Sequence, residues 1–126
     1  MNPVALVFAS VAGLLHVAIF AMESLLILRP SVWRRFLLTS QAEAQAVHPW
    51  AINQGFYNLF LAAGALGGVV ASIGGADASA TAVVAFSCGC MVAAGAVLIG
   101  TDRRMLRAAI LQAGPPLVAL MALAVG

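Results

Sequence analysis

Residues 50–61 read WAINQGFYNLFL, an apolar helical stretch that carries four hydrogen-bonding side chains. These side chains are Asn53, Gln54, Tyr57 and Asn58, and they form two pairs with a spacing of four residues. Because residues four apart are neighbours on a helix, the two pairs lie on adjoining faces. Polar groups in a membrane helix are costly unless they are hydrogen-bonded. The stretch therefore predicts either hydrogen bonds to neighbouring helices or contact with a ligand.

The rest of the chain has the composition of a membrane protein. Of its 126 residues, 63% are hydrophobic and only 8% are charged, whereas soluble domains carry about 25% charged residues. The chain is thus expected to form a single all-α domain, residues 1–126, folded as an integral membrane four-helix bundle. Its apolar stretches predict four spans, at about residues 3–28, 49–71, 80–100 and 105–125.

The positions of the arginines predict the orientation of the bundle. The chain has no lysine, and all six arginines flank the connection between spans one and two or the connection between spans three and four. Those connections lie on the same side, which the positive-inside rule makes cytoplasmic. We therefore expect a multi-pass protein of the inner membrane with both termini outside. Because the arginines form no long basic run, nucleic acid is not an expected partner.

Two local patterns predict structure outside the bundle core. Residues 31–38 alternate apolar side chains with Arg34 and Arg35, which favours a short amphipathic segment on the membrane surface. Ser40 followed by Glu43 has the form of a capping box and predicts a helix start near Gln41.

Small residues predict the packing of the helices. In the third span, Ala85, Gly89 and Ala93 follow one another at four-residue spacing and predict a face for close helix packing. The glycine faces and the small size of the bundle also favour a homo-oligomer.

Polar residues of three spans are expected at one depth. At about 1.5 Å per helical residue, Glu23, the Asn53–Gln54 pair and Gln112 lie roughly 6 to 10 Å inside the cytoplasmic boundary, and Tyr57 and Asn58 lie about a turn deeper. An acid in hydrocarbon usually faces a bundle interior or a wet cavity. Glu23 is therefore a candidate proton or ligand site, and the alternative is that it extends toward the headgroups near Arg29.

The histidines and cysteines leave several roles open. His16 stands seven residues before Glu23 on roughly the same helix face, where it serves either as a proton relay or as a packing residue. His48 lies at the interface beside Pro49. Two histidines and two cysteines on unconnected helices show no metal-ligand spacing, so no metal site is predicted. We expect no cofactor, with haem at His16 or His48 as the open alternative.

Several of these motifs together resemble a known family. The motifs are HVAIFAME at residues 16–23, the 36–43 segment, NQGFYN at residues 53–58 with LFLAAG after it, and Gln112 with Pro115 and Pro116. Over nearly the full chain they resemble the bacterial membrane proteins grouped as domain of unknown function 1304. That family typically shows a Gly-Leu-Tyr-Asn-Gly version of the central block, from which Phe56 and Leu59 depart, and Leu59 in place of a small residue would narrow a pocket there. The resemblance implies a small four-span inner-membrane protein and supplies no activity.

The residues favour a binding function. We expect a cytoplasm-facing pocket for a small, partly apolar molecule or a proton, used for transport or sensing. Its expected lining is Glu23, Asn53, Gln54, Tyr57, Asn58 and Gln112, with His16 below. One alternative is an intramembrane isomerase-type enzyme on a lipophilic substrate, with Glu23 or His16 as acid or base. Another is an accessory subunit of a membrane complex, in which the polar layer is purely structural.

Overall fold

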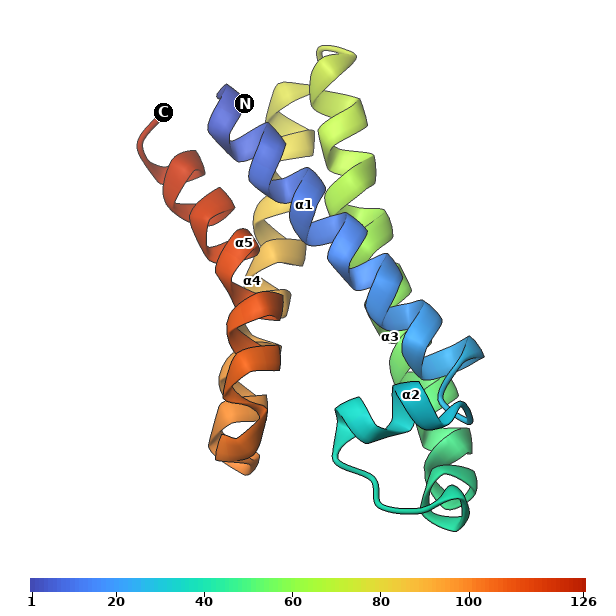
Figure 1. Cartoon of the computed structure of the whole chain (residues 1–126). Coiled ribbons are helices and arrows are strands. Elements are labelled where there is room, and N and C mark those ends of the chain that lie inside the picture. The colour runs from blue at the N-terminus through green and yellow to red at the C-terminus, as the bar shows by residue number, and fades with distance from the viewer. The chain divides into compact units, whose positions relative to one another are not determined.

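The computed structural model describes residues 1–126 and contains helices but no strands (Figure 1). The all-α fold expected from the sequence is confirmed, and its four long helices are consistent with a four-helix bundle. The long helices are α1 (Pro3–Phe20), α3 (Gln41–Ile73), α4 (Asp77–Thr101) and α5 (Leu106–Ala124). Four short elements complete the chain: η1 (Ala21–Leu25), α2 (Pro30–Trp33), η2 (Arg34–Phe36) and η3 (Arg103–Met105).

Four stretches of helix are long and apolar enough to cross a membrane: Pro3–Leu25, Gln41–Ile73, Asp77–Thr101 and Arg103–Ala124. The second differs most from the expected span, because α3 extends 33 residues without interruption through Pro49. At about 1.5 Å per residue α3 measures about 50 Å, which exceeds the roughly 30 Å of a hydrocarbon core. The polar first turns of α3 account for the excess.

The start of α3 follows the expected capping pattern with one change. The N–H of Glu43 donates to Oγ of Ser40 at 3.1 Å, which confirms the helix start. The Glu43 carboxylate accepts hydrogen bonds from Thr39, from its N–H at 2.7 Å and from its hydroxyl at 2.9 Å. The returning half of the capping box thus binds one residue earlier than the motif implies.

The chain divides into two compact units. The first unit comprises Met1–Leu15 and Leu61–Gly126, and the second comprises His16–Phe60. The expectation of a single domain stays a prediction.

The first unit is packed through small residues. Its core includes Ala9, Val69, Val84, Cys88 and Ala119. In the α4–α5 hairpin, a Cβ added to Gly95 would lie 2.7 Å from the Cβ of Ala113, so these helices approach closely because Gly95 has no side chain.

The small-residue face expected on α4 does not pack within the chain. A Cβ added to Gly89 would meet no atom within 4 Å, and Ala93 is exposed. The residues that α4 buries lie on another face: Ala80, Val84, Ser87, Cys88, Met91 and Gly95. Spacing alone does not distinguish these faces, because both contain small residues, and the larger Val84 and Met91 fill the core.

Within the first unit, the N-terminus lies beside the α3–α4 turn, and the end of α5 lies beside Asn2 (Figure 1). The Met1 ammonium group donates to Asp77 at 3.1 Å and to the Ser72 hydroxyl at 3.3 Å, while Asn2 Nδ2 donates to the Ala122 carbonyl at 2.6 Å. The other end of α4 leads into a turn at which the Asp102 carboxylate accepts from the side chain and N–H of Arg104. These hydrogen bonds lower the pKa of the Asp102 carboxyl.

The second unit has its own small core, formed by Ile27, Trp33 and Ala44 with Phe36, Leu38 and Ala51 packed against it. The amphipathic segment expected at residues 31–38 forms α2 and η2, and its Trp33 is buried against the chain itself. Trp33 Nε1 donates to Gln41 Oε1 at 3.2 Å, which attaches the segment to α3. The arginines of this connection are exposed: Arg29, Arg34 and Arg35.

Candidate functional site

The first span ends in a π-helix that carries Glu23. From Ala21 to Leu25 the α-helix of α1 changes into η1, and the N–H of Leu26 donates to the Ala21 carbonyl, five residues back, at 3.0 Å. Short π-helices within α-helices are rare and occur frequently at functional sites. The wider turn changes the direction of the side chains that follow it, so ordinary helical spacing does not relate His16 to Glu23.

A serine and a glycine fix η1 against α3. The Ser24 hydroxyl donates to the Ile52 carbonyl at 3.0 Å. Across from it, a Cβ on Gly55 would collide with the Ser24 hydroxyl and lie 3.1 Å from the Ser24 backbone nitrogen. The absence of a side chain at residue 55 therefore allows η1 to approach α3, and the approach places the neighbouring Glu23 against that helix.

The Glu23 carboxylate binds an amide of the central polar stretch. Asn58 Nδ2 donates to Glu23 Oε2 at 2.8 Å and to the Gln54 carbonyl at 3.2 Å. Asn58 is only 6% exposed, and Glu23 is half-buried. The ion pairs of the structure join Met1 to Asp77 and Arg104 to Asp102, so Glu23 is engaged with α3 and with no arginine.

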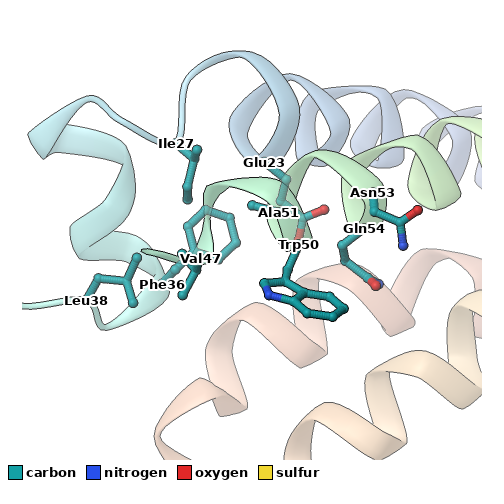
Figure 2. A pocket seen from close by; sticks show the side chains of 9 residues that line it. All are labelled: Glu23, Ile27, Phe36, Leu38, Val47, Trp50, Ala51, Asn53 and Gln54. Atoms are coloured by element: carbon teal, nitrogen blue, oxygen red, sulfur yellow. The ribbon is translucent and has the colours of Figure 1, made fainter. Parts of the chain in front are cut away.

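Glu23 lines a cavity of about 330 Å³ within the second unit. Figure 2 shows Phe36, Leu38 and Val47 gathered at one end of this cavity, with Trp50 and Gln54 further along α3 and Glu23 beside them on η1. Its volume lies near the lower end of the range of about 300–1,000 Å³ typical of small-molecule sites. The complete lining is Glu23, Ile27, Phe36, Leu38, Val47, Trp50, Ala51, Asn53 and Gln54.

The structure brings together some of the expected site residues. Glu23, Asn53 and Gln54 line the cavity, and Asn58 lies behind it, bonded to Glu23. Tyr57 is 58% exposed and is not part of the cavity lining. Its ring lies edge-on to the Phe60 ring, with 6.3 Å between the two ring centres. The ligand-binding role expected for all these residues stays a prediction.

Two expected residues are not among those that line the cavity. His16 is fully buried in α1 and does not border the cavity. Gln112 is half-buried on α5 in the first unit, so the polar layer expected to include it stays a prediction. The structure holds no group of three or more His, Cys, Asp or Glu side chains that could bind a metal ion.

The apolar walls of the cavity were not anticipated as part of a site. Ile27, Phe36 and Leu38 come from the connection between α1 and α3, and Val47 comes from the part of α3 before Pro49. The signal for Phe36 is its place on the apolar side of the 31–38 segment. In the structure this side packs against α3, and a position of the segment on the membrane surface stays a prediction.

The helices and the cavity together define a multi-pass, all-α membrane protein with a carboxylate beside a small cavity. The chain belongs to the family described as protein of unknown function (DUF1304), whose model matches residues 10–124. This match includes every cavity-lining residue and confirms the resemblance noted in the sequence. No curated protein and no solved structure matches the chain.

Proposed function

We propose that this protein binds a small, partly apolar molecule in the cavity beside Glu23, and that a change in the protonation of Glu23 couples binding to transport or sensing. The observation that carries the proposal is a carboxylate at the wall of a mostly apolar cavity. Such a combination of a mostly apolar lining and a few polar groups is typical of small-molecule sites.

A purely structural role for Glu23 explains less of this arrangement. A hydrogen bond between membrane helices contributes about 0.6 to 2 kcal/mol, and the Glu23–Asn58 bond alone would supply that contribution. It requires neither the cavity nor the Trp50 and Gln54 side chains that line it. The cavity therefore supports binding over simple attachment of α1 to α3.

The orientation of the site follows from the arginines. Glu23 lies in the same unit as Arg29, Arg34 and Arg35, which the positive-inside rule assigns to the cytoplasmic side. We place the protein in the inner membrane with the cavity accessible from the cytoplasm. A proton reaching Glu23 from that side removes its negative charge and so changes its attraction for a ligand.

A second copy of the chain is part of the proposal. The glycines Gly67 and Gly89 have no atom within 4 Å of an added Cβ, so their faces are open to another molecule. Small residues allow helices in lipid to approach closely. We infer that copies of the chain associate through such faces as a homo-oligomer.

Tryptophan fluorescence tests the binding function. In a Trp33→Phe variant the only remaining tryptophan is Trp50, which lines the cavity and is 77% exposed. Protein in lipid nanodiscs is titrated with phenylbutanol and phenylbutylamine at weakly acidic and weakly alkaline pH. We expect a saturable change in Trp50 emission with at least one probe, and a pH dependence that is lost in Glu23→Gln.

Two further variants make this test specific. Ala51→Phe places a large side chain in the cavity and is expected to abolish the saturable change. Glu43→Gln removes an exposed acid of the same helix outside the cavity lining and is expected to leave the response unchanged. An absence of saturation with both probes, or equal saturation in Ala51→Phe, contradicts the proposed function.

A further inference from the structure

The charge in the cavity is of one sign. Glu23 is the only ionisable side chain in its lining, and the other polar members, Asn53 and Gln54, are neutral amides. The one hydrogen bond that the chain donates to this carboxylate comes from Asn58 and ends on Oε2. Oxygen Oε1 accepts no hydrogen bond from the chain, so it remains available to a donor in the cavity.

The nearby arginines do not neutralise Glu23. None of them forms an ion pair with it, although Arg29, Arg34 and Arg35 belong to the same unit. The Arg34 guanidinium lies over the Trp33 ring, 5.3 Å from its centre, on the segment beyond Ile27. A half-buried acid without a cationic partner is less favourable than an exposed one unless it is protonated or an occupant compensates it.

The walls of the cavity also suit a cation. Trp50 and Phe36 both line it, and the faces of aromatic rings attract ammonium groups. The aliphatic side chains Ile27, Leu38 and Val47 supply a surface for an apolar body. An anionic occupant would meet the Glu23 carboxylate with like charge, and an uncharged one would leave that carboxylate uncompensated.

We propose that the occupant of this cavity is a lipophilic amine: a small molecule with a protonated nitrogen and an apolar body. The nitrogen donates to Glu23 Oε1 while the apolar body lies against Phe36, Leu38 and Val47. This inference rests on the proposed binding function and adds the chemical class of the ligand.

Three probes with one carbon skeleton and different charge test the inference. Phenylbutylamine is cationic at neutral pH, phenylbutanol is uncharged and phenylbutyrate is anionic. Each is titrated into Trp33→Phe protein in nanodiscs of neutral lipid, with Trp50 emission as the readout. We expect the amine to bind at least about tenfold more tightly than the alcohol, as a charge-assisted hydrogen bond implies, and the acid to bind most weakly.

Variants at Glu23 separate charge from shape. Glu23→Gln is expected to weaken amine binding at least about tenfold and to leave alcohol binding nearly unchanged. Glu23→Asp keeps the charge and is expected to retain the preference for the amine, which provides a second readout if Glu23→Gln does not fold. Asp102→Asn removes one acid outside the cavity and is expected to change neither affinity.

The outcomes distinguish this inference from the proposed function. Equal affinities for amine and alcohol, or an amine preference that persists in Glu23→Gln, overturn the assignment of an amine and leave small-molecule binding intact. Tighter binding of the acid than of the amine overturns it as well. If no probe saturates Trp50 emission in the wild-type cavity, both the binding function and the ligand class are wrong.

Discussion

Gly55 influences the site although it has no side chain of its own. It faces Ser24 across the η1–α3 contact, where the serine hydroxyl donates to the Ile52 carbonyl. Because Glu23 directly precedes Ser24, the space at residue 55 also determines how near the carboxylate comes to Asn58. The bond between Glu23 and Asn58 therefore depends on a contact made by neither of them.

A methyl group at residue 55 is expected to destabilise the protein. In Gly55→Ala the new Cβ collides with the Ser24 hydroxyl, and overpacking of this kind costs about 1–3 kcal/mol. Thermal unfolding in detergent, followed by circular dichroism, is expected to show a lower Tm. Gly67→Ala on the same helix is the matched control, because nothing lies within 4 Å of its added Cβ. Equal Tm values for the two variants would contradict this role of Gly55.

At the residue scale, the sequence identifies the polar side chains that are unfavourable in lipid without a partner, but it does not identify the small residues that position them. Glu23, Asn53, Gln54 and Asn58 could be selected because polar side chains in an apolar span need partners. Ser24 and Gly55 could not, since small residues occur throughout membrane helices and carry no distinctive pattern. The sequence also does not predict which amide binds the Glu23 carboxylate, because the choice depends on the π-helical turn.

Among the elements, the α4–α5 hairpin shows how the choice of packing face depends on the neighbouring helix. Gly95 contacts Ala113 closely, whereas Gly89 lies on an open face of the same helix. Both glycines belong to runs of small residues. The four-residue spacing predicts close packing of the Gly89 face, which does not pack within the chain. The choice is made by the larger core residues Val84 and Met91, whose burial orients α4.

A large side chain on α4 is expected to act differently at these two positions. Gly95→Leu forces α4 away from α5 and is expected to lower Tm strongly, because its Cβ alone would approach the Ala113 Cβ to 2.7 Å. Gly89→Leu is expected to leave Tm nearly unchanged and to reduce a chemically crosslinked dimer, since it covers an open face. A Tm for Gly89→Leu as low as that of Gly95→Leu would show that the Gly89 face is packed in the monomer.

For the whole molecule, the four spans could be predicted from composition and length, and the arginines predict their direction. The limits of α3 were harder to place, because its first turns are polar and continue the same helix past the expected membrane boundary. The division of the chain into two compact units has no signal in the sequence, since it depends on which parts of α1 and α3 pack together.

The orientation predicts a pattern of cysteine labelling. In a Cys88→Ala/Cys90→Ala background, Ala76→Cys lies at the α3–α4 turn beside the N-terminus and Thr101→Cys lies at the arginine-flanked end of α4. We expect a membrane-impermeant maleimide to label residue 76 in intact cells and residue 101 only after permeabilisation, because the positive-inside rule predicts that the arginine side is cytoplasmic. The cysteine-free parent provides the background. The reverse pattern would place both termini inside.

The π-helix at Ala21–Leu25 makes the site depend on the number of residues in the chain as well as on their identity. A π-helical turn closes its hydrogen bond over one residue more than an α-helical turn, so deletion of Ala21 or Met22 would leave an ordinary α-turn and remove the local widening around Glu23. Substitutions at the same two positions leave the count of residues unchanged. A chain of this family with a one-residue gap just before the acid would therefore be expected to lack the π-helix.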